Sequence, residues 1–183
     1  YLSHAETRFT DCRVHKSALL GAAGEGFKLA QTRLGPGRIH HCMRWIGIAN
    51  RALELLCTHA QQRQIGHERT LADSDITKQT IAKNAANIEA AKALVLKTAW
   101  QIEHEGFKAA RHNISMIKYF TAQMLQQCMD DTLQALGGLG MTDDTILAYF
   151  FRHERAARIY DGPDEVHKMV VASVLNSMFW RWN

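Results

Sequence analysis

Residues 76–105 read ITKQTIAKNAANIEAAKALVLKTAWQIEHE, and apolar side chains recur along them at every third or fourth position. This spacing places the apolar side chains on one face of a helix, because an α-helix has about 3.6 residues per turn. The stripe consists of Ile76, Ile81, Ala85, Ile88, Val95, Ala99 and Ile102. Ser74 precedes the stripe at the position of an N-cap, and Gly106 ends it. The pattern predicts a long helix that buries one face.

The same spacing predicts further helices on both sides of this one. Their expected ranges are 38–63, 109–136, 143–159 and 163–179. The first of these patterns begins at Phe27, but Gly35-Pro-Gly37 interrupts it, so we expect the helix itself to start near Arg38. Long helices joined by short loops predict an all-α fold, an up-and-down bundle.

Residues 1–27 differ in character from the rest of the chain. Positions 9–20 include a short alternating stretch, and the glycine-rich run Gly21-Ala-Ala-Gly-Glu-Gly26 follows. These patterns predict a strand, a turn and a connection. Because one or two strands do not form a stable sheet alone, we expect residues 1–27 to be the end of a middle β-domain. Residues 28–183 are then expected to form the helical domain.

Composition limits the classes of function. Hydrophobic residues make up 46% and charged residues 22%, which are ordinary globular values. The net charge of +4 is mild, so nucleic acid is not an expected partner, whereas an anionic ligand is compatible. No apolar run approaches the roughly 20 residues of a membrane span. The four cysteines and ten histidines lack the spacing of a disulfide framework or a metal site, which predicts an intracellular protein without a metal.

Residues 158–167 read RIYDGPDEVH and join two predicted helices. Asp161-Gly162-Pro163 has the composition of a turn, because glycine allows positive φ and proline fixes its own φ. Pro163 at the first helical position, followed by two acidic residues, is typical of a helix N-terminus. On this interpretation, Asp161 or Gly162 is only the cap of the last helix.

The same segment also resembles the signature near the end of acyl-CoA dehydrogenases, whose usual form is Ile-Tyr-Glu-Gly-Thr-x-x-Ile. In that family the glutamate is the catalytic base. Asp161 stands at its position here and Pro163 replaces the threonine, which is similar to a subgroup that carries aspartate as the base. The resemblance implies that Asp161 removes a proton from the substrate, with Tyr160 and Gly162 as neighbouring substrate-binding residues. Aspartate is shorter by one methylene, on the order of 1.5 Å, so we expect a displaced turn or a differently seated acyl chain.

The resemblance extends from residue 9 to about residue 171. Phe9-Thr-Asp-Cys-Arg-Val14, followed by Gly24-Glu-Gly-Phe27, is similar to the end of the family's middle β-domain. Arg38 matches an arginine near the acyl-CoA ligand, which makes it a candidate substrate-binding residue. Some subfamilies place their catalytic glutamate one residue earlier, where this chain has Gly37. The resemblance therefore leaves Asp161 as the candidate base.

Residues 134–140 read QALGGLG at the end of a predicted helix. A helix C-cap explains the glycines by itself, and the preceding strand and the spacing of a dinucleotide-binding fingerprint are missing. The segment nevertheless resembles the family's Gln-x-x-Gly-Gly-x-Gly segment, which lies against the flavin diphosphate of a neighbouring subunit. Arg63 matches an arginine that meets the diphosphate, although the family's Arg-x-x-Phe-Gly is here Arg63-Gln-Ile-Gly-His67, without the aromatic residue. The implied FAD contacts are Arg63, Gln134, Gly137, Gly138, Pro163 and Glu165.

The resemblance implies an FAD-dependent enzyme that dehydrogenates an acyl-CoA thioester between its α and β carbons. It also implies a homo-oligomer, either a dimer or a tetramer, and an electron-transfer flavoprotein as the acceptor. This chain alone is expected to be inactive, because other domains of the family hold the flavin ring and much of the acyl-CoA. Two alternatives stay open: a flavoprotein oxidase of the same fold, similar to nitroalkane oxidases, and a non-catalytic helical oligomerisation domain. The expected location is the bacterial cytoplasm, or a mitochondrion or peroxisome.

Overall fold

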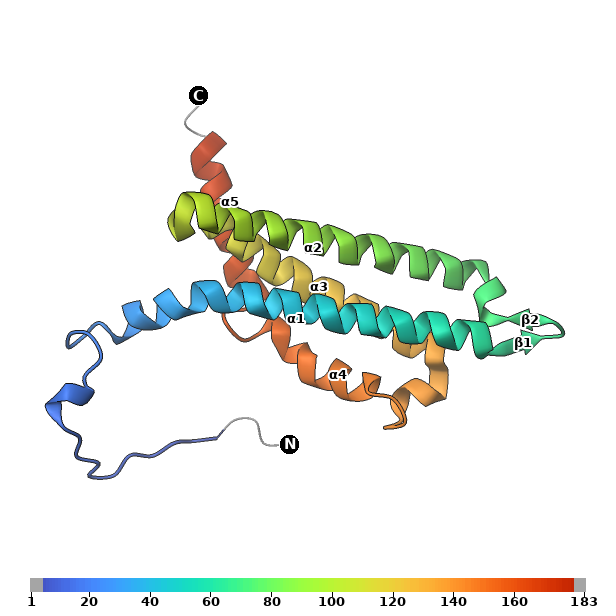
Figure 1. Cartoon of the computed structure of the whole chain (residues 1–183), viewed down its shortest axis with the longest axis horizontal. Coiled ribbons are helices and arrows are strands. Elements are labelled where there is room, and N and C mark those ends of the chain that lie inside the picture. The colour runs from blue at the N-terminus through green and yellow to red at the C-terminus, as the bar shows by residue number, and fades with distance from the viewer. Residues whose placement is uncertain (1–4, 180–183) are drawn as a thin grey trace. The chain divides into compact units, whose positions relative to one another are not determined.

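The computed structural model describes residues 5–179. Over this range the chain forms five α-helices and one short hairpin (Figure 1). The helices are α1 (Gly26–Gln62), α2 (Asp75–Ala109), α3 (Arg111–Leu136), α4 (Leu147–Glu154) and α5 (Asp164–Phe179). Strands β1 (Gln64–Gly66) and β2 (Arg69–Thr70) pair in the antiparallel sense. The predicted all-α class is confirmed, and none of the helices in the described range combines the length and the apolarity that a bilayer crossing requires.

The chain divides into two compact units, Tyr1–Leu34 and Gly35–Asn183. In the first unit, residues 5–15 have no regular secondary structure, and Lys16–Ala18 forms a 3₁₀ turn. The strand predicted within residues 9–20 is therefore wrong. A strand needs a partner for its backbone N–H and C=O groups, and in the described range β1 and β2 pair only with each other. The assignment of residues 1–27 to a separate domain remains a prediction.

In the second unit, α3 is the central helix. It packs against α2, α4 and α5, and α1 lies along it (Figure 1). Small side chains lie where α1 and α3 meet. One of them, Cys128 on α3, donates from its Sγ atom to the Ala49 carbonyl on α1 at 3.5 Å. The stripe predicted on residues 76–105 supplies Ile88 and Val95 to the buried core. The large side chains of that core that are at most 3% exposed are Trp45, Ile46, Ile88, Val95, Ile117, Leu125, Met129 and Leu147.

The start of α1 differs from the prediction. The helix begins at Gly26 rather than near Arg38, and Pro36 lies inside it. A proline removes one backbone hydrogen bond from a helix, but its own φ is close to the helical value. The preceding residues include Lys28, Leu29, Ala30, Gln31 and Arg33, which all favour helix. Their combined propensity explains why the helix starts before the proline.

The helix predicted over residues 143–159 is also shorter than expected. Helix α4 spans only Leu147–Glu154, and a 3₁₀ turn, Arg155–Arg158, follows it. The Thr145 hydroxyl accepts a bond from the Leu147 N–H at 3.4 Å. Local side-chain bonds of this kind compete with helical backbone bonds, so the preceding residues stay outside the helix.

The other predicted helix ends are confirmed. Ser74 is the N-cap residue of α2. Gly106 interrupts the end of α2 with a φ of 83°, and Gly137 follows α3 with a φ of 60°. Glycine adopts this left-handed conformation without the steric penalty of a Cβ atom. The glycine positions therefore marked the ends of the long helices correctly.

Candidate functional site

The predicted base, Asp161, lies in the turn that joins the 3₁₀ segment Arg155–Arg158 to α5. Its backbone φ is 54° and that of Gly162 is 98°, so both residues are left-handed. Glycine adopts this conformation readily, and aspartate tolerates it better than most residues do. A Cβ atom added at Gly162 would lie 2.8 Å from His167 Nε2, so a side chain there would displace the histidine. The residue types of this turn therefore match its shape.

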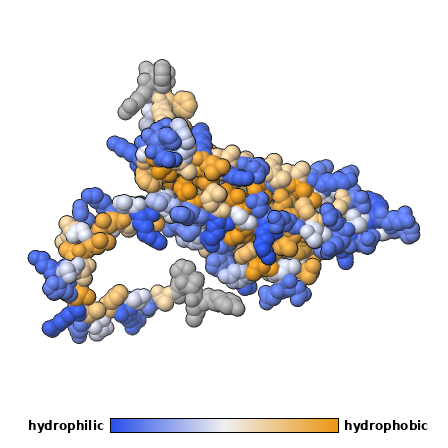
Figure 2. All heavy atoms as spheres, in the orientation of Figure 1, coloured by the Kyte–Doolittle hydropathy of each residue, from blue (hydrophilic) through white to orange (hydrophobic). Residues whose placement is uncertain are grey.

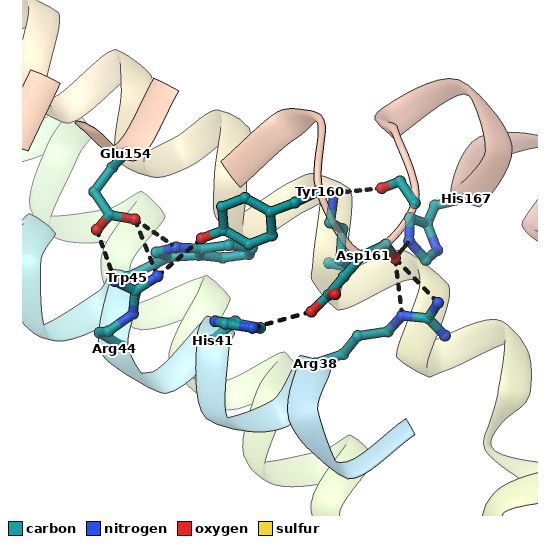
Figure 3. Close-up of polar contacts among 10 residues, drawn as sticks. Arg38, His41, Arg44, Trp45, Glu154, Tyr160, Asp161 and His167 are labelled. Atoms are coloured by element: carbon teal, nitrogen blue, oxygen red, sulfur yellow. Dashed lines mark hydrogen bonds and ion pairs between the residues drawn. The ribbon is translucent and has the colours of Figure 1, made fainter. Parts of the chain in front are cut away.

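Three side chains from three helices hold the turn through its backbone (Figure 3). Arg38 of α1 donates to the Asp161 carbonyl from Nε at 3.2 Å and from Nη2 at 3.0 Å. His167 Nε2 of α5 donates to the same carbonyl at 3.1 Å. Lys118 of α3 is buried and donates to the Gly162 carbonyl at 2.5 Å. Burial lowers the pKa of both Arg38 and Lys118, and the negative charge of Asp161 acts against that shift.

The Asp161 carboxylate has a different partner. His41 Nε2 lies 3.0 Å from its Oδ2 atom, and the side chains are 34% exposed for His41 and 21% for Asp161. Burial lowers the pKa of His41; the Asp161 charge raises this pKa and the Arg44 charge lowers it. His41 can donate a proton to this oxygen in any form that carries a hydrogen on Nε2, which includes one neutral tautomer and the imidazolium. Within residues 5–179, the Oδ1 atom of Asp161 has no hydrogen-bond partner.

Aromatic rings fix the orientation of His41 (Figure 3). The Trp45 ring stacks on it with centroids 5.8 Å apart and 19° between the planes, and Tyr160 tilts against His41 at 5.2 Å. Trp45 is fully buried, and its indole N–H donates to Glu154 at 3.0 Å. Arg44 donates to Glu154 at 2.7 and 3.2 Å and to the Tyr160 hydroxyl at 2.8 Å. Each ring around His41 is thus held by its own polar partner.

The structure brings together only part of the predicted site. Arg38, Tyr160, Asp161 and Gly162 all belong to the turn or contact it. Arg38 binds the backbone of the turn, and the Tyr160 ring packs against His41. The predicted FAD contacts Pro163 and Glu165 are exposed where α5 begins, next to this turn in the sequence.

The other predicted FAD contacts lie near the opposite end of α1. Arg63 follows this helix, and its carbonyl accepts a bond from Leu71 N–H at 2.8 Å. Gln134 and Leu71 line one cleft of about 330 Å³, and the adjacent glycines at 137 and 138 are exposed. In Figure 2 the end of the molecule that carries β1 and β2 is hydrophilic. Because a helix rises about 1.5 Å per residue, Arg63 lies about 37 Å from Arg38 along the axis of α1.

Six residues of the site were not predicted: His41, Arg44, Trp45, Lys118, Glu154 and His167. His41 and Trp45 follow Arg38 on α1 at spacings of three and seven residues, which places all three on one helix face. That spacing is a signal that could have found them. Lys118 and Glu154 carry no such signal, because their partners lie 44 and 109 positions away in the sequence.

We expect His167 to make the folded protein less stable below about pH 6.5. Its Nε2 donates to the Asp161 carbonyl, and within the described residues its buried Nδ1 has no partner, so a second proton would lack an acceptor. Burial lowers the pKa of His167, and the charges of Arg38 and Lys118 act in the same direction. The unfolded chain therefore takes up this proton first as the pH falls, and the free energy of unfolding decreases.

Urea titrations between about pH 7 and about pH 5 measure this effect. His167→Gln should flatten the pH dependence by up to about 1.4 kcal/mol per pH unit, because the amide donates to the carbonyl without titrating. An unchanged slope would contradict the prediction.

Comparison with known proteins identifies the class to which this fold and turn belong. The model of the acyl-CoA dehydrogenase C-terminal domain matches residues 24–176, so the chain belongs to the acyl-CoA dehydrogenase family. "Probable acyl-CoA dehydrogenase FadE2" of Mycobacterium tuberculosis is 43% identical over 169 residues, which are 92% of this chain and 41% of that protein. The chain therefore spans less than half the length of this relative.

Two solved structures have the same fold. Butyryl-CoA dehydrogenase from Megasphaera elsdenii is 29% identical, with a TM-score of 0.82 over 91% of this chain and 43% of that one. The structure of PigA with FAD and proline is 20% identical, with a TM-score of 0.83 over 92% of this chain and 43% of that one. The resemblance to the acyl-CoA dehydrogenase family is therefore confirmed.

Proposed function

We propose that this chain is the C-terminal domain of an FAD-dependent acyl-CoA dehydrogenase in which Asp161 is the catalytic base. One observation carries the proposal. Asp161 presents a partly buried carboxylate on a turn whose backbone is held by Arg38, Lys118 and His167, while one carboxylate oxygen stays without a partner in the described range. A base must be held within reach of the proton that it removes.

The reaction removes a proton from the α carbon of an acyl-CoA thioester and a hydride from its β carbon. Bound FAD would accept the hydride. Asp161 takes the α-proton onto the oxygen that has no other partner, and His41 retains its bond to the second oxygen.

The residues near the end of α1 fit the diphosphate of FAD. The Arg63 side chain is exposed and forms no ion pair with the described residues, and a guanidinium suits phosphate oxygens. A Cβ atom at Gly137 or Gly138 would meet no atom within 4 Å, so the backbone there is open to a ligand. Gln134 adds an exposed amide. Arg63 follows the C-terminal end of α1, whereas Arg38, which binds the Asp161 turn, lies 25 residues earlier on the same helix. We therefore assign Arg63, Gln134 and the two glycines to the cofactor of a neighbouring subunit.

A homo-oligomer, a dimer or a tetramer, is part of the proposal. Helix α5 exposes Val166, Met169, Met178 and Phe179, with Met169 70% and Phe179 71% exposed. Large exposed apolar side chains favour association. We further propose an electron-transfer flavoprotein as acceptor and an intracellular location.

Anaerobic bleaching of the bound flavin tests the proposed function. The full-length natural protein that contains this chain should bind FAD, and at least one member of a panel of acyl-CoA thioesters should bleach it. Reoxidation by oxygen should then be slow compared with reoxidation by an electron-transfer flavoprotein. Fast reoxidation by oxygen would favour an oxidase, and a failure to bind FAD would leave the helical oligomerisation domain as the better explanation.

A further inference from the structure

His41 places its Nε2 atom 3.0 Å from Oδ2 of the Asp161 carboxylate. It stands one helical turn from Arg38 on the same face of α1. Arg38 binds the backbone carbonyl of Asp161, and His41 binds its side chain. One helix face therefore fixes both the position of the turn and the direction of its carboxylate (Figure 3).

We propose that His41 is a positioning residue that holds Oδ2 of Asp161 and thereby directs Oδ1 toward the substrate. This role rests on the proposed function of Asp161 as the base. An aspartate side chain can rotate about two torsions, and the backbone clamp on the turn does not restrain them. The close contact of His41 Nε2 with Oδ2, at 3.0 Å, opposes rotation about these torsions.

The surroundings of His41 support this role, because the ring itself cannot turn freely. The Trp45 ring stacks on the His41 ring, and the Tyr160 ring is tilted against the His41 ring. Trp45 is anchored in turn by its bond to Glu154, which is 2% exposed. A continuous set of contacts thus runs from a buried carboxylate through two rings to the proposed base.

Two variants separate the hydrogen bond of His41 from its ring. His41→Phe keeps a ring that can stack on Trp45 but removes the donor, whereas His41→Gln keeps an N–H donor at a similar reach but removes the ring. In the full-length protein loaded with FAD, His41→Phe should slow anaerobic flavin reduction by about 100-fold, because misplacement of a reacting group by about 1 Å has an effect of this size. The Kd for the acyl-CoA and the Tm should stay unchanged. His41→Gln should restore the rate to within a few-fold of the natural protein.

Asp161→Asn distinguishes failure of this inference from failure of the proposed function. If Asp161→Asn is inactive and His41→Phe reduces its flavin at the natural rate, Asp161 is the base but His41 does not position it. If both His41 variants are slow and both lose thermal stability, the role of His41 is structural and the inference is overturned. If Asp161→Asn retains the natural rate, the proposed base itself is wrong. A crystal structure of His41→Phe gives a readout without turnover, since the released carboxylate should occupy more than one rotamer.

Discussion

Asp161→Asn in the full-length protein is expected to slow anaerobic flavin reduction by about 100- to 10,000-fold, the range that a general base contributes. The amide has the shape of the carboxylate, and its oxygen can still accept the bond from His41, but it cannot take up the α-proton. Asparagine also tolerates the left-handed φ of 54° at this position. Stopped-flow bleaching by an acyl-CoA measures the rate, with FAD content and Tm as controls that should not change.

Asp161→Glu provides a second control for this result. Glutamate is the usual residue of the family at this position, but here it would have to adopt a left-handed φ and would extend past His41 by about one carbon–carbon bond, roughly 1.5 Å. We therefore expect an intermediate rate, between those of the natural protein and the Asn variant. If the Asn variant keeps a rate within about tenfold of the natural one, which is less than a general base supplies, then another group removes the proton.

Glu154→Ala is expected to reduce the free energy of unfolding by about 1–3 kcal/mol, the effect of leaving a buried donor without its acceptor. The Glu154 carboxylate is 2% exposed and binds both the Arg44 guanidinium and the Trp45 indole N–H. Without it, the fully buried indole N–H would lose its acceptor. Urea or thermal unfolding monitored by circular dichroism measures the change.

A surface carboxylate supplies the matched control for this prediction. Glu103 lies on the same kind of element, the long helix α2, but is exposed, so Glu103→Ala should change stability by no more than about 0.5 kcal/mol. Glu154→Gln should fall between the two, because its amide oxygen can still accept from Trp45 while its NH₂ group faces Arg44. Equal stability of Glu154→Ala and Glu103→Ala would show that Glu154 and its partners do not act as a buried pair.

The helices and the turn around Asp161 could be predicted because their signals are local. Apolar spacing fixed the extent of α2 and α3, and the glycines at 106 and 137 marked their ends. The strand within residues 9–20 was mispredicted because an alternating pattern indicates a strand only where a partner strand exists. The early start of α1 was missed because the propensity of several residues outweighed one proline.

The surroundings of the candidate base were harder to predict, because they depend on contacts between distant segments. Arg38 and Asp161 are separated by 123 positions, and no local pattern states that one binds the carbonyl of the other. Lys118 lies in a helix whose amphipathic pattern does not predict a buried cation. Its acceptor is the carbonyl of Gly162, which only the folded structure brings close to it. The sequence therefore indicated the candidate base, but it did not predict that Arg38, Lys118 and His167 would hold the turn that carries it.

The side chains that fix the turn bind mainly its main-chain carbonyl oxygens. The groups that fix the turn are therefore different from the carboxylate proposed to react. Arg38, Lys118 and His167 would keep the same bonds whatever side chain stood at position 161, since each binds a carbonyl group. What limits that position is the left-handed φ, which admits glycine, asparagine and aspartate far more easily than branched or bulky residues. The scaffold can therefore accept a change of chemistry at one residue without rebuilding the loop, but only within this short list of side chains.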